Sequence, residues 1–172
     1  RYGELIAASE RGKPDISPPF GFNRIITPER YDSRIMDLLG VKYVLSLSDL
    51  DSPKLDLVFR EGETRVYFNK NFFPRAFLVC DYLVAQDKQS AINLLMDEEV
   101  DLKKKVIVEE KISGDLSLCK DSGGEVGVKD YDLNSVRLEV VTSQKALLVL
   151  ADSFYPGWDA LVDGYSTKIY RA

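Results

Sequence analysis

The sequence of 172 residues contains no histidine. This absence excludes Ser-His-Asp and Cys-His catalysis and every zinc site with a histidine ligand, and it removes the side chain best suited to proton transfer near neutral pH. Acid–base chemistry would have to come from Asp, Glu, Lys, Tyr or Ser with a shifted pKa. The missing histidine agrees with a chain that has no catalytic residue, no metal site and no cofactor, which is what we expect here.

Cysteine is scarce as well, and only Cys80 and Cys119 are present. Two cysteines so far apart exclude a dense disulfide framework, and they do not have the spacing of a metal site. Both end apolar stretches, "AFLVC" and "LSLC", which favours two free cysteines packed as small hydrophobic residues. A single disulfide between them is the alternative.

The chain also lacks an excess of positive charge and a long apolar run. Its net charge of −5 argues against a nucleic-acid partner and against attraction to anionic lipid. The longest uninterrupted apolar run, "ALLVLA" at 146–151, is far shorter than the roughly 20 residues of a membrane-spanning helix. Hydrophobic residues nevertheless make up 45 % of the chain, enough to form a core. We expect a single soluble domain fragment covering residues 1–172.

The pattern along the chain predicts an α+β, β-rich fold with antiparallel sheets and two to three short helices. Residues 1–30 contain four of the seven prolines, which predicts an extended lead-in because proline lacks a backbone donor; a short helix near "YGELIAAS" is compatible with it. Residues 31–120 predict a mixed α/β part. The sequence "TPERYDSRIMDLLG" predicts a helix that begins either at Pro28 or one turn later at Asp32 or Ser33, and that ends at Gly40.

Further elements of the mixed part follow from hydrophobic periodicity. A second helix should begin near Asp87 and present Ala91, Leu94 and Leu95 on one side. Strands are expected in "VKYVLSL", in a hairpin around "EGET", in "RAFLVC" and in "KKKVIVEEK".

The last part, residues 131–172, predicts β-sandwich strands. It follows "DSGGEVGVKDYD" at 121–132, which predicts a flexible connection because it matches no calcium or phosphate loop. Strands are expected in "SVRLEVVTS", in "ALLVLADS" as a strand buried on both faces, and in a hairpin around Asp163-Gly164. Since "STKIYRA" reads as a strand without a closing turn, we expect both ends to be cuts in a larger protein and the sandwich to be truncated.

Two kinds of site can be sought in these residues. Paired carboxylates could act in acid–base chemistry or bind calcium, but neighbours of this kind are expected in a chain with 28 acidic residues. The pairs are Asp49 with Asp51, Glu109 with Glu110, Asp130 with Asp132, and Asp152 with Asp159.

Aromatic residues near the end of the chain could instead form a platform for sugar rings. Tyr155, Trp158 and Tyr165 are the candidate ligand contacts. Trp158 should pack in the core, because it alternates with Ala160 and Val162 on one face of a strand, which leaves the two tyrosines as the better exposed candidates.

Three stretches occur in an order that is similar to a known family: "RIMDLLGVKYVLS", "VYFNKNFFPRAFLV" and "ADSFYPGWDALVDGYSTKIYRA". From about residue 30 onward the chain resembles the extracytoplasmic C-terminal region of bacterial membrane proteins of the YfhO type, which are related to GT-C glycosyltransferases. Tyr67-Phe68-Asn69 stands where the family pattern has Tyr-Glu-Asn, and the family's further strands and last membrane helix lie beyond Ala172.

The resemblance implies a non-catalytic domain on the outer face of a bacterial cytoplasmic membrane, accessory to sugar transfer from a lipid-phosphate donor to a cell-surface glycan or polymer. Because the family's catalytic carboxylate lies in a loop near its first membrane helices, no catalytic residue carries over to this chain. The implied partners are the membrane portion of the same polypeptide and a glycan or polyprenyl-linked sugar acceptor. A free-standing carbohydrate-binding β-sandwich module and a hydrolase that uses Asp152 and Asp159 are the alternatives.

Overall fold

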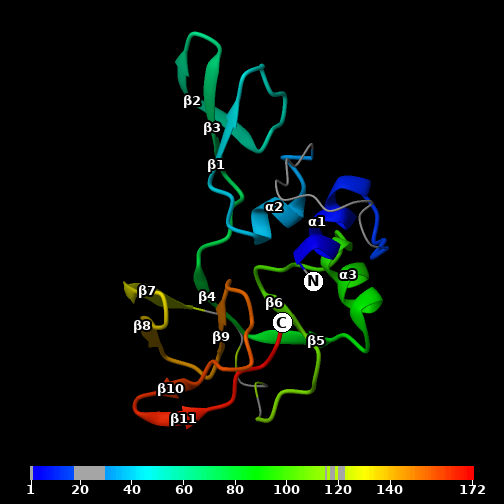
Figure 1. The fold of residues 1–172 in the computed structure, drawn as a ribbon. Helices are drawn as coiled ribbons and strands as arrows, with labels where there is room; N and C mark the ends of the chain where they lie inside the picture. Colours follow the sequence, from blue (N-terminus) through cyan, green and yellow to red (C-terminus); the bar gives the residue numbers. More distant parts are fainter. Residues whose placement is uncertain (1, 18–29, 115, 117–118, 120–122) are drawn as a thin grey trace. The chain divides into compact units, whose positions relative to one another are not determined.

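A computed structural model describes residues 2–17, 30–114, 116, 119 and 123–172. The chain divides into two compact units, residues 1–74 and 75–172. The described residues form three short helices and eleven strands, most of them in antiparallel sheets (Figure 1). The predicted α+β, β-rich class is confirmed. None of the helices among these residues is long and apolar enough to cross a membrane.

The first unit begins with α1 (Tyr2–Arg11). The short helix that was compatible with the lead-in is therefore present, and the expectation of a mainly extended start is wrong for these ten residues. A whole turn in the middle of α1 is buried, and its apolar residues are small or branched: Ile6, Ala7 and Ala8. The Ser9 hydroxyl lies 2.6 Å from that of Ser33, which joins α1 to the start of the next helix.

That next helix, α2 (Arg34–Leu38), begins at the later of the two predicted positions. The Ser33 Oγ accepts a hydrogen bond from the Met36 backbone N at 3.4 Å, as an N-cap does. The earlier start at Pro28 lies outside the described residues. The predicted end is confirmed: Gly40 has φ 70°, and the Val41 N donates to the Met36 carbonyl at 3.0 Å, which is the hydrogen bond of a Schellman motif.

Three strands in the order β1-β3-β2 complete the first unit. They are β1 (Tyr43–Ser46), β2 (Leu55–Glu61) and β3 (Thr64–Asn69), all antiparallel. Glu61 pairs with Thr64 across a two-residue turn, and Gly62 in that turn has φ 55°, which favours glycine. The predicted hairpin around "EGET" is confirmed.

The described residues of the second unit form three antiparallel strand pairs and one parallel pair. Strand β4 (Ala76–Val79) pairs antiparallel with β9 (Leu147–Leu150). Strand β5 (Asp81–Val84) pairs parallel with β6 (Lys105–Val108). The connection between β5 and β6 carries α3 (Lys88–Met96), as a parallel crossover requires.

Helix α3 begins after Asp87, as predicted. The Asp87 carboxylate forms a capping box with Ser90. Strand β5 was not predicted separately from "RAFLVC", and its parallel partner was not expected either. The parallel pairing could not be inferred from neighbouring residues, because Asp81 pairs with Lys105, 24 positions further along the chain.

Cys80 and Cys119 form a disulfide, with their Cα atoms 5.3 Å apart. The preference for two free cysteines is therefore wrong. Cys80 lies between β4 and β5, and the bond ties this corner to the connection that follows β6. Sequence spacing could not show it, since 39 positions separate the two residues and only the fold brings them together.

A long hairpin formed by β7 (Gly124–Tyr131) and β8 (Val136–Thr142) corrects the prediction of a flexible connection at 121–132. Residues 121 and 122 lie outside the described part, but from Gly124 onward the segment is a strand. Close packing explains the glycine at position 124, because a Cβ there would lie 2.5 Å from the Val141 carbonyl oxygen and 2.7 Å from the Leu78 side chain. The backbone of β7 thus lies against β4 with no room for a side chain.

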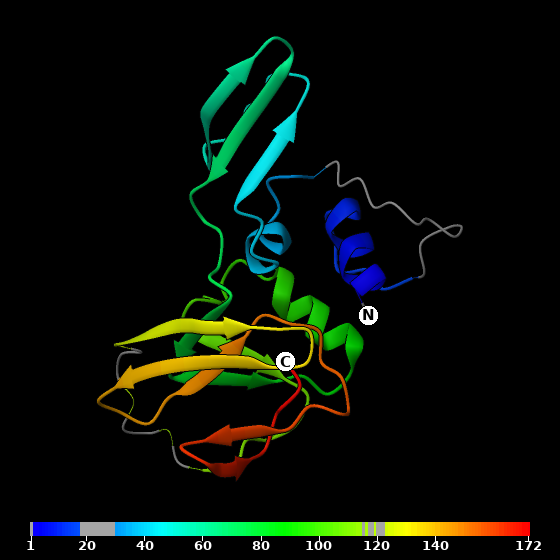
Figure 2. The same cartoon turned by 60° about the vertical axis from the view of Figure 1, so that its left-hand side comes forward.

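The predicted hairpin around Asp163-Gly164 is present as β10 (Ala160–Val162) and β11 (Tyr165–Thr167). It forms a separate two-stranded ribbon (Figure 2). Strand β9 is not buried on both faces as predicted, because Leu148 is 42 % exposed. The strands of the second unit pair two by two, so the sandwich stays a prediction.

Candidate functional site

The three predicted ligand contacts lie in or beside the β10–β11 ribbon. Tyr155 is 69 % exposed and Tyr165 is 79 % exposed, as predicted for a contact surface. Trp158 is only half-buried, so its placement in the core is wrong. The expected common buried face does not form because Val162, which should share it, is 55 % exposed.

Tyr155 and Trp158 are the two ends of a tight turn. The Trp158 N donates to the Tyr155 carbonyl at 3.0 Å across Pro156-Gly157. Gly157 has no positive φ, so the backbone does not require glycine at this position. The Tyr155 ring explains it instead, since a Cβ on Gly157 would lie 3.2 Å from Cε1 and 3.4 Å from Cδ1 of that ring.

The ribbon itself follows from its turn. Asp163 has φ 52° and Gly164 has φ 85°, two consecutive positive values that define the turn best suited to a two-residue hairpin. Val162 pairs directly with Tyr165 across the turn, and Leu161 is 70 % exposed. The side chains of the ribbon therefore face solvent from both of its sides.

Both ends of the segment 153–167, which we call the arm, are held by polar contacts. Before the arm, the Tyr131 hydroxyl donates to Asp152, and Arg75 Nη1 donates to the Ala151 carbonyl at 2.7 Å. The Arg75 guanidinium also lies 5.2 Å from the centre of the Tyr131 ring. The sequence pointed to Asp152 only as a partner of Asp159, and its grouping with Arg75 and Tyr131 was not predicted, because the three side chains come from three separate strands or strand ends.

After the arm, the chain returns to the connection that follows β6. Lys168 Nζ lies 2.6 Å from Glu110, and the Glu109 N donates to the Arg171 carbonyl at 3.1 Å. The Ser113 N donates to the Tyr170 hydroxyl at 3.0 Å. These contacts hold the exit of the arm as the Arg75, Tyr131 and Asp152 contacts hold its entrance.

Hydrogen bonds shift the pKa values of groups at both ends of the arm. The hydrogen bond from Tyr131 lowers the pKa of the Asp152 carboxyl, and the same bond raises the pKa of Tyr131. The hydrogen bond to Glu110 raises the pKa of Lys168. Each shift moves the pKa of Asp152, Tyr131 or Lys168 further from neutral pH.

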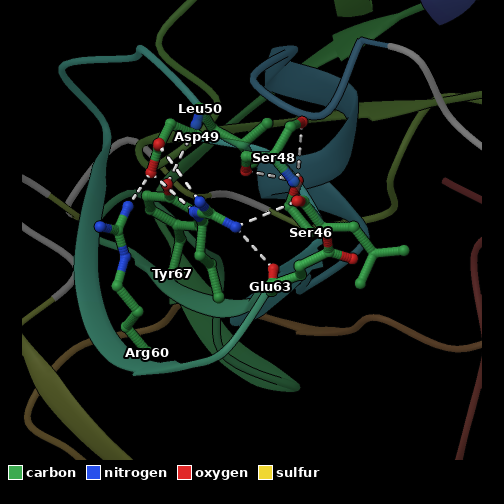
Figure 3. Close-up of polar contacts among 9 residues, drawn as sticks. Ser46, Ser48, Asp49, Leu50, Arg60, Glu63 and Tyr67 are labelled. Atoms are coloured by element: carbon green, nitrogen blue, oxygen red, sulfur yellow. Dashed lines mark hydrogen bonds and ion pairs between the residues drawn. The ribbon is translucent and has the colours of Figure 1, made fainter.

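A second polar cluster lies in the first unit, on the three-stranded sheet. Arg60 and Arg65 are direct cross-strand partners on β2 and β3, an arrangement of like charges that destabilises a sheet. Asp49 offsets the repulsion, because Arg65 Nε donates to its Oδ1 at 2.7 Å and Arg60 donates to the same oxygen. Figure 3 shows the Arg60 side chain reaching to Asp49.

The same cluster fixes the segment that follows β1. The Leu50 N donates to the Tyr67 hydroxyl at 3.0 Å, and Arg65 Nη1 donates to the Leu47 carbonyl at 3.0 Å (Figure 3). The hydrogen bond from Arg65 is the main cause that lowers the pKa of Asp49. These contacts hold the segment that follows β1 against the sheet.

In each carboxylate pair named from the sequence, at least one member is bound by another side chain. Asp49 binds two arginines, Asp130 lies 3.3 Å from Arg137, and Asp152 accepts from Tyr131. Among the described residues, no group of three or more acidic or cysteine side chains could hold a metal ion. Asp49, Asp130 and Asp152 thus form hydrogen bonds and ion pairs within the fold.

Comparisons with family models, with curated proteins and with solved structures found no match to this chain.

Proposed function

We propose that this chain is a non-catalytic extracytoplasmic domain of a polytopic, GT-C-like membrane protein of the YfhO type, accessory to the transfer of sugars from a lipid-phosphate donor to a cell-surface glycan or polymer. The proposal starts from the order of the three sequence stretches that resemble this family. The Cys80–Cys119 disulfide supports it, because disulfides persist in oxidising compartments outside the cytoplasm and are rare within it.

A topology experiment on the complete gene product tests this proposal. Alkaline phosphatase, which is active only outside the cytoplasm, is fused directly after Ala172, and a green fluorescent protein that folds only in the cytoplasm is fused at the same position in a matched strain. We expect phosphatase activity without fluorescence. Fluorescence without phosphatase activity, or a complete product that contains no membrane helix, would reject the proposal.

A carbohydrate-binding module is the second candidate. The high exposure of Tyr155 and Tyr165 favours it, since aromatic rings that face solvent suit the apolar faces of sugars. The two candidates differ in what the complete gene encodes: an independent module would bind glycans without any membrane-spanning part.

A further inference from the structure

The arm combines fixed ends with an exposed middle. Its entrance is held by Tyr131 and Arg75, and its exit by the Lys168–Glu110 ion pair. Between these points the side chains of Tyr155, Leu161 and Tyr165 are 69–79 % exposed. A segment that is held at both ends loses little conformational entropy when it binds a ligand, so its exposed rings are already positioned for contact.

Tyr155 is the most strongly positioned of these rings. One ring edge lies against Gly157, where any Cβ would come within 3.2 Å of it, and the Tyr155–Trp158 hydrogen bond of 3.0 Å closes the turn beneath. Because Gly157 has no positive φ, its backbone conformation does not require glycine. The absence of a side chain at this position instead leaves room for the Tyr155 ring. The rest of the ring faces solvent.

The charge of the arm restricts its ligand. Residues 153–167 contain no lysine or arginine, and their only charged residues are Asp159 and Asp163, which are both exposed. Two cations lie beside the arm: Lys168 directly follows it in the chain, and the Arg171 guanidinium lies 4.5 Å from the centre of the Phe154 ring. Each is paired with a glutamate, Lys168 with Glu110 at 2.6 Å and Arg171 with Glu109 at 3.3 Å. The arm's own charge is therefore negative, and it repels phosphate and carboxylate groups. Asp163 also lies at the tip of the ribbon, where a charge opposes insertion into a lipid bilayer.

From this combination we infer that the arm is a binding site for a neutral glycan, with Tyr155 and Tyr165 as the stacking residues. The rings contact the apolar faces of pyranose units, and the carboxylates of Asp159 and Asp163 accept hydrogen bonds from sugar hydroxyls. The inference rests on the glycan contact in the proposed function, and it adds the site and the charge class of the sugar.

Binding can be followed through Trp158, the only tryptophan of the chain, which lies in the arm. The 172-residue protein is titrated with neutral oligosaccharides (gluco-, galacto-, manno- and N-acetylglucosamine hexamers) and with the anionic polymers polygalacturonate and hyaluronate. We expect a saturable fluorescence change with at least one neutral oligosaccharide and none with the anionic polymers. Tyr155→Ala and Tyr165→Ala should each weaken binding at least tenfold, while circular dichroism stays unchanged.

Gly157→Ala is a sharper test, because it places a methyl group against the Tyr155 ring and leaves the ring itself present. It should weaken binding several-fold. Gly127→Ala is the matched control, since a Cβ on Gly127 would meet nothing within 4 Å, and its affinity should equal that of the native chain.

Three results would overturn the inference. They are the absence of binding to every neutral oligosaccharide of the panel, stronger binding to the anionic polymers, and neutral binding that survives both tyrosine substitutions. Self-association that disappears in Tyr165→Ala, without any sugar binding, would show that the arm contacts a second copy instead. None of these results depends on the topology experiment, so the site and the cellular location can fail separately.

Discussion

Asn69 Nδ2 donates a hydrogen bond of 2.9 Å to Asp37 Oδ1, and both residues are buried. The contact joins β3 to α2 within the first unit. Asp37 also accepts from Lys54 Nζ at 2.7 Å, and Asn69 donates to the Val41 carbonyl at 2.9 Å. The buried carboxylate thus has an amide and an ammonium partner, which is what a charge removed from water needs.

We predict that Asn69→Ala lowers the free energy of unfolding of the first unit by about 2 kcal/mol, because it removes a buried hydrogen bond to a charged group. Urea denaturation measures the change. Asp56→Asn is the control: it breaks the exposed Lys70–Asp56 pair of 3.1 Å and should cost less than about 1 kcal/mol. Equal losses in the two variants would mean that the buried contact contributes no more than a surface pair.

The Cys80–Cys119 disulfide should stabilise the second unit by about 4 kcal/mol, the chain-entropy value for a closed loop of this size, since 39 positions separate the two residues. Cys80→Ser, Cys119→Ser and the double variant should lose the same amount, because each removes the same bond. Thermal unfolding with and without reductant measures the loss. An unfolding transition that reductant leaves unchanged in the native chain would contradict the prediction.

Tyr131→Phe should raise the pKa of the Asp152 carboxyl toward its ordinary value, because the hydrogen bond that lowers the pKa is lost. The sign for stability follows from this direction. A carboxyl whose pKa is lowered by folding stabilises the native state above its unfolded pKa of about 3.9, and this contribution disappears as the pH falls through the lower native pKa.

The stability difference between the native chain and Tyr131→Phe should therefore be present at pH 5–7 and shrink below about pH 4. Carboxyl NMR titration measures the pKa, and denaturation at several pH values measures the stability. Tyr155→Phe is the control and should leave the Asp152 titration unchanged. If the difference in stability stays constant down to the lowest pH, Tyr131 does not stabilise the fold through the Asp152 carboxylate.

Arg65→Gln should raise the pKa of Asp49 more than Arg60→Gln does, because the Arg65 hydrogen bond is the largest cause of the lowered pKa. Arg65 also holds the Leu47 carbonyl at 3.0 Å, so its loss should free the segment beside it. Amide hydrogen exchange at Leu50, whose N donates to Tyr67, should be faster in Arg65→Gln than in Arg60→Gln. The reverse order would assign the clamp to Arg60.

Local features were predictable from the residues alone. The start of α3 at Asp87, the end of α2 at Gly40 and the turn at Asp163-Gly164 each depend on one to three neighbouring residues. Caps and two-residue turns have strict requirements for φ or for a side-chain acceptor, and few residue types meet them. The exposure of Tyr165 belongs with these features, because the hairpin that carries it is local, and Tyr155 lies in the equally local turn that ends at Trp158.

Other features depended on residues that are distant in the sequence. The parallel β5–β6 pair, the disulfide and the strand at Gly124 each require a partner at least 17 positions away: Val141 lies beside Gly124, and Cys119 beside Cys80. The alternation of Trp158 with Ala160 and Val162 predicted that Trp158 lies in the core. Among the described residues, however, β10 and β11 pair only with each other, and their two-stranded ribbon buries neither face.

The caps, the turns and the lack of lysine and arginine within residues 153–167 can be read from neighbouring residues alone. The tertiary structure decided which residues hold the arm at its two ends: Arg75, Tyr131 and Asp152 at the entrance, Glu109, Glu110 and Ser113 at the exit. A cap or a tight turn is satisfied within a few residues of chain, whereas a clamp needs atoms that only long-range packing brings within hydrogen-bonding distance.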